Sequence, residues 1–353
     1  MDSDEEEQDK MEKVLLIAYT EPDGHLAKAT SELIGCARAL VADLEGATWS
    51  IGLIGNDVQD AADRMAGCGA ERIWAVRGES FGQPRYATDA AAAEALARAT
   101  EATILLAAAG SRASRALPGI APRLGGRCDA HMTALEVADG QILATRWYYR
   151  QRMVARMKRS QRPWILTMEP GCAEPFSPEP GKVQVETIDV EVPEQLTRTK
   201  VVGIQTPPAS QQTIRPDADL LFVAGAGWTK KQQDGQPHVP EAERLIVSFL
   251  NHSKASLGGS KSMVDLSSEG QETLSIMTHL NQIGQTGSTP RHPKGLATCC
   301  HGEEPHVVGW RFINERRAIN NDPNCGWAHG KADVLYVADA FRVMENVNQL
   351  LGR

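Results

Sequence analysis

The sequence predicts an α/β fold in two domains: an N-terminal α/β domain of nucleotide-binding-like type and a C-terminal domain built on a doubly wound parallel sheet. The first observation is size, because 353 residues with 42% hydrophobic side chains exceed what one core usually encloses. The second is the alternation of short apolar runs with helix-like stretches, which is typical of parallel sheets with crossover helices. The third is a proline-rich stretch without periodicity, 205–216, which predicts a linker between the domains.

The N-terminal domain is expected to span 13–204 and to begin its alternation at the apolar run 14–18. The alanine-rich stretch 87–99 favours a helix through its intrinsic propensity, and the run 103–108 after it favours a buried strand. The other expected elements are, in order, a helix at 26–40, a strand at 51–54, a helix at 58–66, a strand at 72–76 and a helix at 114–124.

A local basic segment lies between residues 145 and 163. It sets arginine and lysine side chains among aromatic and methionine residues, although the whole chain has a formal net charge of −8. We interpret it as the solvated face of a β-ribbon or as a docking surface for an acidic protein partner. Nucleic acid also attracts arginines mixed with aromatics, but the acidic balance of the chain argues against that partner. The basic residues are Arg146, Arg150, Arg152, Arg156, Lys158, Arg159 and Arg162.

The segment 1–12 is expected to be a disordered acidic tail, with an acidic docking arm as the alternative. Its charge is the opposite of the cationic start of a signal or transit peptide. No apolar run approaches the length needed to cross a bilayer, so no membrane span is expected. The seven cysteines include no C-x-x-C spacing and the histidines no H-x-x-x-H, so neither a disulfide scaffold nor a metal site is expected. A soluble protein of the reducing cytoplasm is the resulting expectation.

The second domain is expected to span 217–353 and to open with the apolar run 219–224, which leads directly into a glycine-containing loop. A helix is expected at 241–251. The apolar run 334–338 and the amphipathic stretch 341–351 then close the chain.

Three loops of this domain are rich in Gly, Ser and Thr, at 225–227, 258–261 and 282–287. Loops of this composition leave backbone N–H groups free to face phosphate oxygens. Taken singly, each loop is ordinary turn chemistry, and none matches G-x-G-x-x-G.

In their order and spacing, however, these loops resemble the flavin-binding domain of electron-transfer flavoprotein α subunits. The two most specific elements are Q-x-G-Q-T-G, present as 282–287, and I-N-x-D-P, present as 319–323. In the first domain the resemblance runs from the opening strand and the helix start at Ala29 through the helix near Arg123. It therefore spans nearly the whole chain after the acidic tail. Further motifs of the flavin-binding domain have counterparts at 224–227, 258–265, 299–309 and 337–339.

The resemblance implies a redox carrier rather than an enzyme that transforms a substrate. Proteins of this family hold FAD non-covalently and form a heterodimer with a β subunit, towards which the isoalloxazine ring faces. The implied path takes electrons from a soluble flavin dehydrogenase, the donor, to a quinone reductase or another acceptor.

The resemblance also implies roles for single residues. Ser260 and Lys261 are expected near the flavin ring, where a cation and neutral donors stabilise the negative charge of reduced flavin. Asn320 and Asp339 are expected at the adenosine end.

The remaining roles fall on two loops: Gln285 and Thr286 at the N5 edge of the ring, His306 at its pyrimidine carbonyl, and the loop 301–306 at the pyrophosphate. Each residue alone also fits a structural role such as a turn, a helix cap or a buried histidine. The full set of candidate cofactor-binding residues is Ala226, Ser260, Lys261, Ile283, Gly284, Gln285, Thr286, His301, Gly302, Glu303, Glu304, Pro305, His306, Asn320, Asp339 and Ala340.

Several positions depart from the family pattern. Ala226 and Ser288 stand where the family has an arginine and a lysine, and Lys261 stands where it has a second arginine. Glu303 and Glu304 would oppose a nearby phosphate by about 1 to 4 kcal/mol. An insertion also lies around 267–280. These departures support an alternative, a flavin-free or AMP-only scaffold subunit of a dehydrogenase complex.

Overall fold

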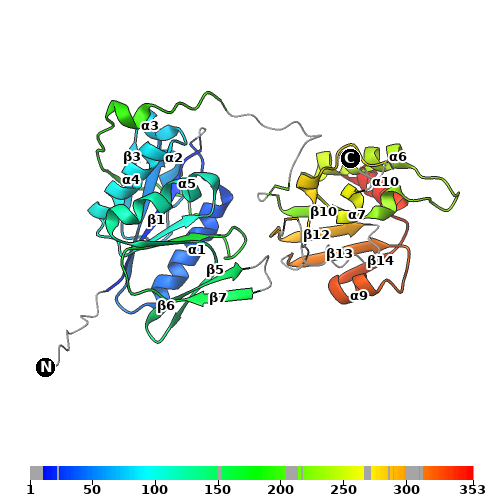
Figure 1. Cartoon of the computed structure of the whole chain (residues 1–353), viewed down its shortest axis with the longest axis horizontal. Helices are drawn as coiled ribbons and strands as arrows, with labels where there is room; N and C mark the ends of the chain where they lie inside the picture. Colours follow the sequence, from blue (N-terminus) through cyan, green and yellow to red (C-terminus); the bar gives the residue numbers. More distant parts are fainter. Residues whose placement is uncertain are drawn as a thin grey trace. The chain divides into compact units, whose positions relative to one another are not determined.

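The computed structural model describes residues 11–21, 24–148, 153–203, 214–215, 218–265, 272–284, 287–288, 290–298, 310 and 313–352. The chain divides into two compact units, Met1–Ile204 and Gln205–Arg353, each with its own sheet (Figure 1). Strands alternate with helices in both units, which confirms the predicted α/β class. Among the described residues, no helix combines the length and apolar character needed to cross a membrane.

A mixed sheet forms the centre of the first unit, with nine described strands in the order β7-β6-β5-β8-β4-β1-β2-β3-β9. An antiparallel ribbon, β5 to β7, extends one end of its parallel part. The parallel strands are β1 Lys13–Tyr19, β2 Thr48–Gly55, β3 Ile73–Arg77, β4 Ile104–Ala108, β8 Trp164–Met168 and β9 Val185–Thr187. The ribbon strands are β5 Arg127–Ala138, β6 Gln141–Tyr148 and β7 Met153–Met157.

The helices of the first unit cover both faces of its parallel strands. Because successive strand residues point to opposite faces, Leu16 of β1 packs in the core under α1 and Leu15 in the core under α4. The helices are α1 Lys28–Asp43, α2 Gln59–Asp63, α3 Glu79–Gly82, α4 Tyr86–Ala99 and α5 Ser111–Ile120, with 3-10 turns at Pro122–Leu124 and Glu194–Thr197. The alanine-rich helix is therefore confirmed as α4.

The structure corrects one sequence expectation for this unit, the end of a helix, and adds detail to another, the basic segment. The helix expected at 58–66 ends at Asp63, because the Met65 N–H bonds back only three residues, to the Ala62 carbonyl at 2.9 Å. The basic segment does contain ribbon strands, and part of its charge is neutralised locally, since Arg156 pairs with Glu136 and Arg159 with Asp129.

After β8 the chain returns across the face that α1 and α2 cover; we call residues 169–187 the return segment. Its backbone bonds to that face at intervals: the Phe176 N–H donates to the Ser31 carbonyl at 2.9 Å, and the Val183 N–H to Asp63 at 3.0 Å. The return segment ends as β9, which pairs in parallel with β3.

The second unit contains a five-stranded sheet in its described residues, parallel throughout, in the order β11-β10-β12-β13-β14. Its strands are β10 Leu220–Ala224, β11 Ser256–Gly259, β12 Lys294–Thr298, β13 Glu315–Asn320 and β14 Val334–Val337. Its helices are α6 Val239–Ser253, α7 Lys261–Asp265, α9 Gly326–Lys331 and α10 Ala340–Leu351, with 3-10 turns at Ala226–Thr229 and His279–Asn281.

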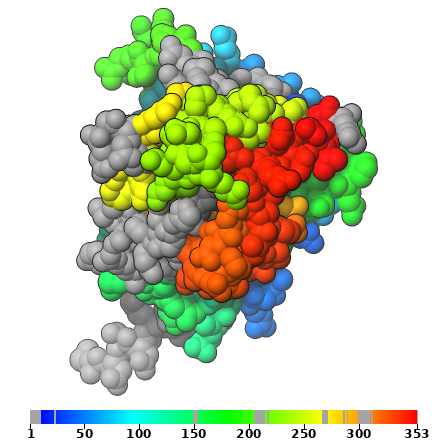
Figure 2. All heavy atoms as spheres, turned by 90° about the vertical axis from the view of Figure 1, so that its right-hand side faces the viewer, coloured from blue at the N-terminus to red at the C-terminus, as the bar shows by residue number. Residues whose placement is uncertain are grey.

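Helices pack on both faces of this second sheet. Phe222 of β10 packs on one face with residues of α6 and α10, whereas Leu221 packs on the other with Trp310 and Trp327. Helices α6 and α10 lie side by side, joined by a bond from the Asn348 amide to the Leu245 carbonyl at 2.9 Å (Figure 2). This two-sided arrangement confirms the predicted doubly wound parallel sheet.

Candidate functional site

The carboxyl ends of β10, β11 and β12 form the centre of the candidate site. With this strand order, the connections leaving β10 and β12 run to opposite sides of the sheet, and such a switch point opens the crevice where α/β sheets bind ligands. Ala224 of β10 pairs with Gly259 of β11 and Thr298 of β12. The three strands therefore end at one level of one edge.

The loop after β10 places Ala226 at this edge. The Gly225 N–H donates to the Thr298 carbonyl at 2.8 Å, and the chain then enters a 3-10 turn in which Ala226 is buried. Trp228, fully buried below the turn, donates from Nε1 to the Thr298 hydroxyl at 2.8 Å. That hydroxyl in turn donates to the Val223 carbonyl at 3.0 Å.

Trp228 and Thr298 were not predicted from the sequence, although they fix the position of the loop after β10. A tryptophan directly after the Gly-Ala-Gly loop was the available signal. Its indole N–H needs an acceptor once it is buried, and that acceptor could be found only from the strand pairing.

Ser260 follows β11 and is fully buried. Its backbone N–H donates to the Ala224 carbonyl at 3.1 Å, and its hydroxyl accepts the Met263 N–H at 3.2 Å, which caps the short helix α7. A serine hydroxyl that accepts one bond retains its hydrogen as a donor. Lys261, the next residue, is half exposed and forms an ion pair with Asp265 one turn along α7.

The described part of the loop at 282–288 is held beside β11. The Ile283 N–H donates to the Gly259 carbonyl at 3.0 Å, and the Ser288 N–H to the Gln282 carbonyl at 2.8 Å. Gly284 has a φ of +114°, a conformation open to glycine but strained for other residues. At Gly287 a Cβ atom would lie 2.2 Å from the Gln282 carbonyl oxygen. These contacts explain why the motif needs glycine at both positions.

Asn320 and Asp339 come together farther along the same edge. Asn320 is the last residue of β13 and pairs with Val337 of β14, so Asp339 follows two residues beyond that pair. The Asn320 side-chain oxygen accepts the Asp322 N–H at 2.9 Å. Asp339 caps α10 by accepting the Arg342 N–H at 3.1 Å, and Ala340 is buried behind it.

The structure thus brings Ala226, Ser260, Lys261, Ile283 and Gly284 to one end of the sheet edge, with the Asn320–Asp339 pair at neighbouring strands. The other candidate residues lie outside the described residues, and their roles stay predictions: Gln285, Thr286, His301, Gly302, Glu303, Glu304, Pro305 and His306.

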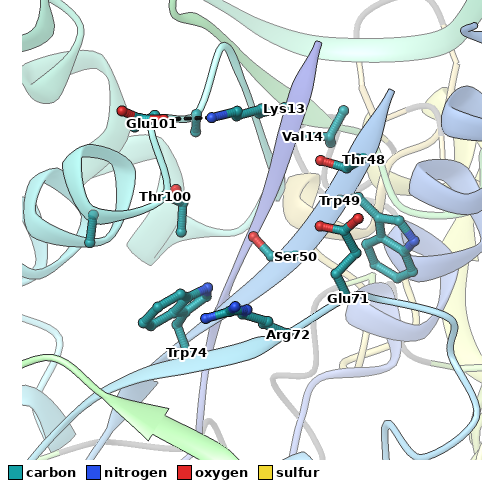
Figure 3. A pocket seen from close by; sticks show the side chains of 12 residues that line it. Lys13, Val14, Thr48, Trp49, Ser50, Glu71, Arg72, Trp74, Thr100 and Glu101 are labelled. Carbon is teal, nitrogen blue, oxygen red and sulfur yellow. Dashed lines mark hydrogen bonds and ion pairs between the residues drawn. The ribbon is translucent and has the colours of Figure 1, made fainter. Parts of the chain in front are cut away.

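A cavity of about 270 Å³ lies elsewhere, at the amino ends of β1, β2 and β3 in the first unit (Figure 3). Its cations already have partners, Lys13 with Glu101 at 2.5 Å and Arg72 with Glu186 at 3.3 Å. The Arg72 guanidinium also lies over the Trp74 ring at 5.7 Å. Since α/β sheets bind ligands at the carboxyl ends of their strands, this cavity does not compete with the candidate site in the second unit.

Together, the fold and the site define a two-unit α/β protein whose second, parallel sheet has a switch point between β10 and β12. Sequence comparison makes the class specific, because the electron transfer flavoprotein domain matches residues 14–193. The chain belongs to the electron transfer flavoprotein family, as a divergent member of its α-subunit type.

Its relatives extend the match over both units. The electron transfer flavoprotein subunit alpha of Thermoanaerobacterium thermosaccharolyticum is 25% identical over 337 residues, covering 94% of this chain and 96% of that protein. Protein FixB of Clostridium saccharobutylicum is 26% identical over 334 residues, covering 93% and 91%. The electron transfer flavoprotein subunit alpha of Clostridium acetobutylicum is 25% identical over 337 residues, covering 93% and 92%.

Proposed function

We propose that this chain carries electrons on a non-covalently held FAD at the carboxyl edge of its second sheet. The observation that best supports the proposal is the convergence of separate loops there. Ala224, Gly259 and Thr298 are in register, and Ile283 is bonded to Gly259, so these four residues lie together at one edge of the sheet. The residues present fit a dinucleotide, because close backbone approach to a pyrophosphate requires glycine-rich turns such as those at Gly284 and Gly287.

The bound flavin would supply the capacity to take up and release electrons. In this proposal Ser260 orients the ring with its hydroxyl, and Lys261 places positive charge where reduced flavin gains negative charge. Asn320 and Asp339 hold the adenosine end, with Ile283 and Ala340 as apolar walls. Gln285, Thr286 and the loop 301–306 complete the site as the family pattern implies.

The partners belong to the same proposal. An electron transfer flavoprotein β subunit is the proposed second subunit, because the two similar proteins named subunit alpha imply a companion chain. The proposed donor is a soluble flavin dehydrogenase and the proposed acceptor a quinone reductase or another oxidant, in the cytoplasm.

The test is to purify the chain with its β subunit and record the visible spectrum and the nucleotide released on denaturation. We expect flavin absorption bands and one FAD per heterodimer. The bands should bleach with a flavin dehydrogenase and its substrate and return with an acceptor. A colourless heterodimer would contradict the proposal.

Ala226 favours a second candidate, a scaffold subunit that binds AMP or no nucleotide. It is a buried alanine at the position where the family supplies an arginine. A colourless preparation that releases AMP alone, or nothing, would support the scaffold function instead.

A further inference from the structure

Two thiols from distant parts of the first unit lie on the same small void. Cys36 is on α1 and Cys172 is in the return segment, and Leu33 and Met168 also line the void. The void measures about 10 Å³, which is the room of a single water molecule. Neither cysteine is in a disulfide, and both are partly exposed, so an oxidant in solution can reach the pair.

The backbone explains why the two thiols meet. Glu32 and Cys36 are four residues apart on α1, so their side chains share one face of the helix. The Glu32 carboxylate accepts the Gly171 N–H, and Cys172 is the next residue. The chain therefore delivers Cys172 to the face of α1 on which Cys36 lies.

The contact between the return segment and α1 is close on both sides of Cys172. At Gly35 an added Cβ atom would lie 2.2 Å from the Glu174 carbonyl oxygen, so the backbones of α1 and the return segment are in direct contact there. The Phe176 N–H bonds to the Ser31 carbonyl at 2.9 Å, and the Arg38 guanidinium lies 5.7 Å from the centre of the Phe176 ring. The return segment is thus held along the helix on the side where the two cysteines line the void.

Cys128, a third cysteine of the first unit, provides the comparison that isolates the effect of a neighbouring thiol. Burial raises the pKa of Cys36 to about 11, with Cys172 as the second cause, and burial also raises the pKa of Cys128 to about 11, with Asp129 as the second cause. The two thiols therefore have similarly small thiolate fractions at neutral pH. They differ in their neighbour, which is a second thiol for Cys36 and a carboxylate for Cys128.

We propose that Cys36 and Cys172 are an oxidation-sensitive thiol pair that forms an intramolecular disulfide with a low-molecular-weight disulfide as the oxidant. The Cys172 thiolate, on the exposed return segment, attacks one sulfur of that disulfide, whose S–S bond breaks and releases one small thiol. The Cys36 thiolate then attacks the Cys172 sulfur, forms the protein disulfide and releases the second small thiol. Two protein thiols are oxidised, one small disulfide is reduced, and the two protons end on the released thiols.

The disulfide would join α1 covalently to the return segment. It would close a long loop through β2, β4 and β8, and a loop of that length restricts the unfolded chain strongly. The inference does not depend on the proposed flavin function, because the pair lies in the first unit.

The test treats the full chain with oxidised glutathione and maps its disulfides by mass spectrometry after non-reducing digestion. We expect a peptide linking Cys36 to Cys172 in the monomeric chain, removed by dithiothreitol. Its yield should fall more than tenfold in Cys36→Ser and in Cys172→Ser but remain unchanged in the matched control Cys128→Ser. The oxidised wild-type chain should also unfold several degrees higher than the reduced chain, with no such shift in Cys172→Ser.

Two results would overturn the proposal. One is glutathione attached to Cys172 without any link to Cys36. The other is a link from Cys128 that forms as readily as the Cys36–Cys172 link. The map of the wild-type chain decides between these outcomes even if a serine variant fails to fold.

Discussion

A buried ion pair joins α4 to α5 in the first unit. Asp89 is fully buried, and Arg112 binds it through two nitrogens, at 2.6 and 2.9 Å. Burial raises the pKa of Asp89, and the Arg112 guanidinium opposes that rise. The guanidinium also donates to the Phe81 carbonyl at 2.5 Å, so it stabilises the backbone before α4 as well.

Arg112→Ala should leave the Asp89 carboxylate buried without its cation and lower the free energy of unfolding by about 3 to 5 kcal/mol. Urea-induced unfolding measures the loss. The matched control is Arg123→Ala, because Arg123 forms a more exposed pair with Glu94 at 3.3 Å and should cost less than about 1 kcal/mol. Similar losses in both variants would mean that burial of the pair does not matter.

Lys261 is the residue through which the proposed flavin role can be tested electrostatically. Removing one positive charge a few ångströms from the ring should disfavour the reduced state by about 1 to 4 kcal/mol. For one electron this lowers the reduction potential by roughly 40 to 170 mV. We expect that shift in Lys261→Ala by spectroelectrochemistry. Lys294→Ala, at the amino end of β12, serves as the control and should leave the potential unchanged.

The raised thiol pKa values predict a distinctive pH profile of alkylation. Since only the thiolate reacts, and burial moves the pKa of Cys36 and Cys128 from 9.0 to about 11, their alkylation rates should still rise about tenfold per pH unit between pH 8 and 10. In the urea-unfolded chain, the alkylation rates of the same cysteines should level off near pH 9. Iodoacetamide labelling read by mass spectrometry measures both profiles, and a folded-state plateau near pH 9 would show that burial does not control them.

At the scale of elements, the loop at 282–288 depends on the absence of a side chain at Gly287. Gly287→Ala forces a methyl group against the Gln282 carbonyl, at 2.2 Å before relaxation, and should displace the loop from β11. We expect FAD affinity to fall at least tenfold, which corresponds to about 1.4 kcal/mol, as measured by titration of the apoprotein. Gly330→Ala is the control, because no heavy atom lies within 4 Å of its added Cβ. An equal loss of FAD affinity in that variant would contradict the prediction.

The sequence predicts elements well where local pattern and tertiary packing agree. The apolar runs that became β1, β4 and β10 are buried on both faces, so hydrophobicity alone identifies them. It misses β11, Ser256–Gly259, and β13, Glu315–Asn320, because glycine and charged residues have low strand propensity. Pairing with β10 makes the first segment a strand, and pairing with β12 and β14 makes the second one a strand. No local window of sequence contains that information.

The candidate site shows the same division between local and tertiary information. Motif resemblance selected Ser260 and Ile283, and strand register explains why they lie together at one edge. The motif resemblance gave no indication of Trp228 or Thr298, because their hydrogen bond joins positions 70 residues apart. The thiol pair was missed for a similar reason, because Cys36 and Cys172 become neighbours only through the return segment.

At the scale of the whole molecule, the two units provide an internal control for where a cofactor binds. A ligand that binds only the folded state stabilises the unit that holds it, by about 2.7 kcal/mol at a free concentration one hundred times its Kd. If FAD binds the second unit as proposed, hydrogen exchange should slow in β10, β11 and β13 when FAD is restored to the apoprotein. Exchange in β1, β2 and β4, which belong to the first sheet, should remain unchanged. A parallel measurement with AMP distinguishes the two functions. The scaffold alternative predicts that AMP protects the second unit as fully as FAD does. A flavin site predicts that only FAD protects the residues near β10 and β11. Protection confined to the first unit would place the ligand away from the switch point and contradict both functions.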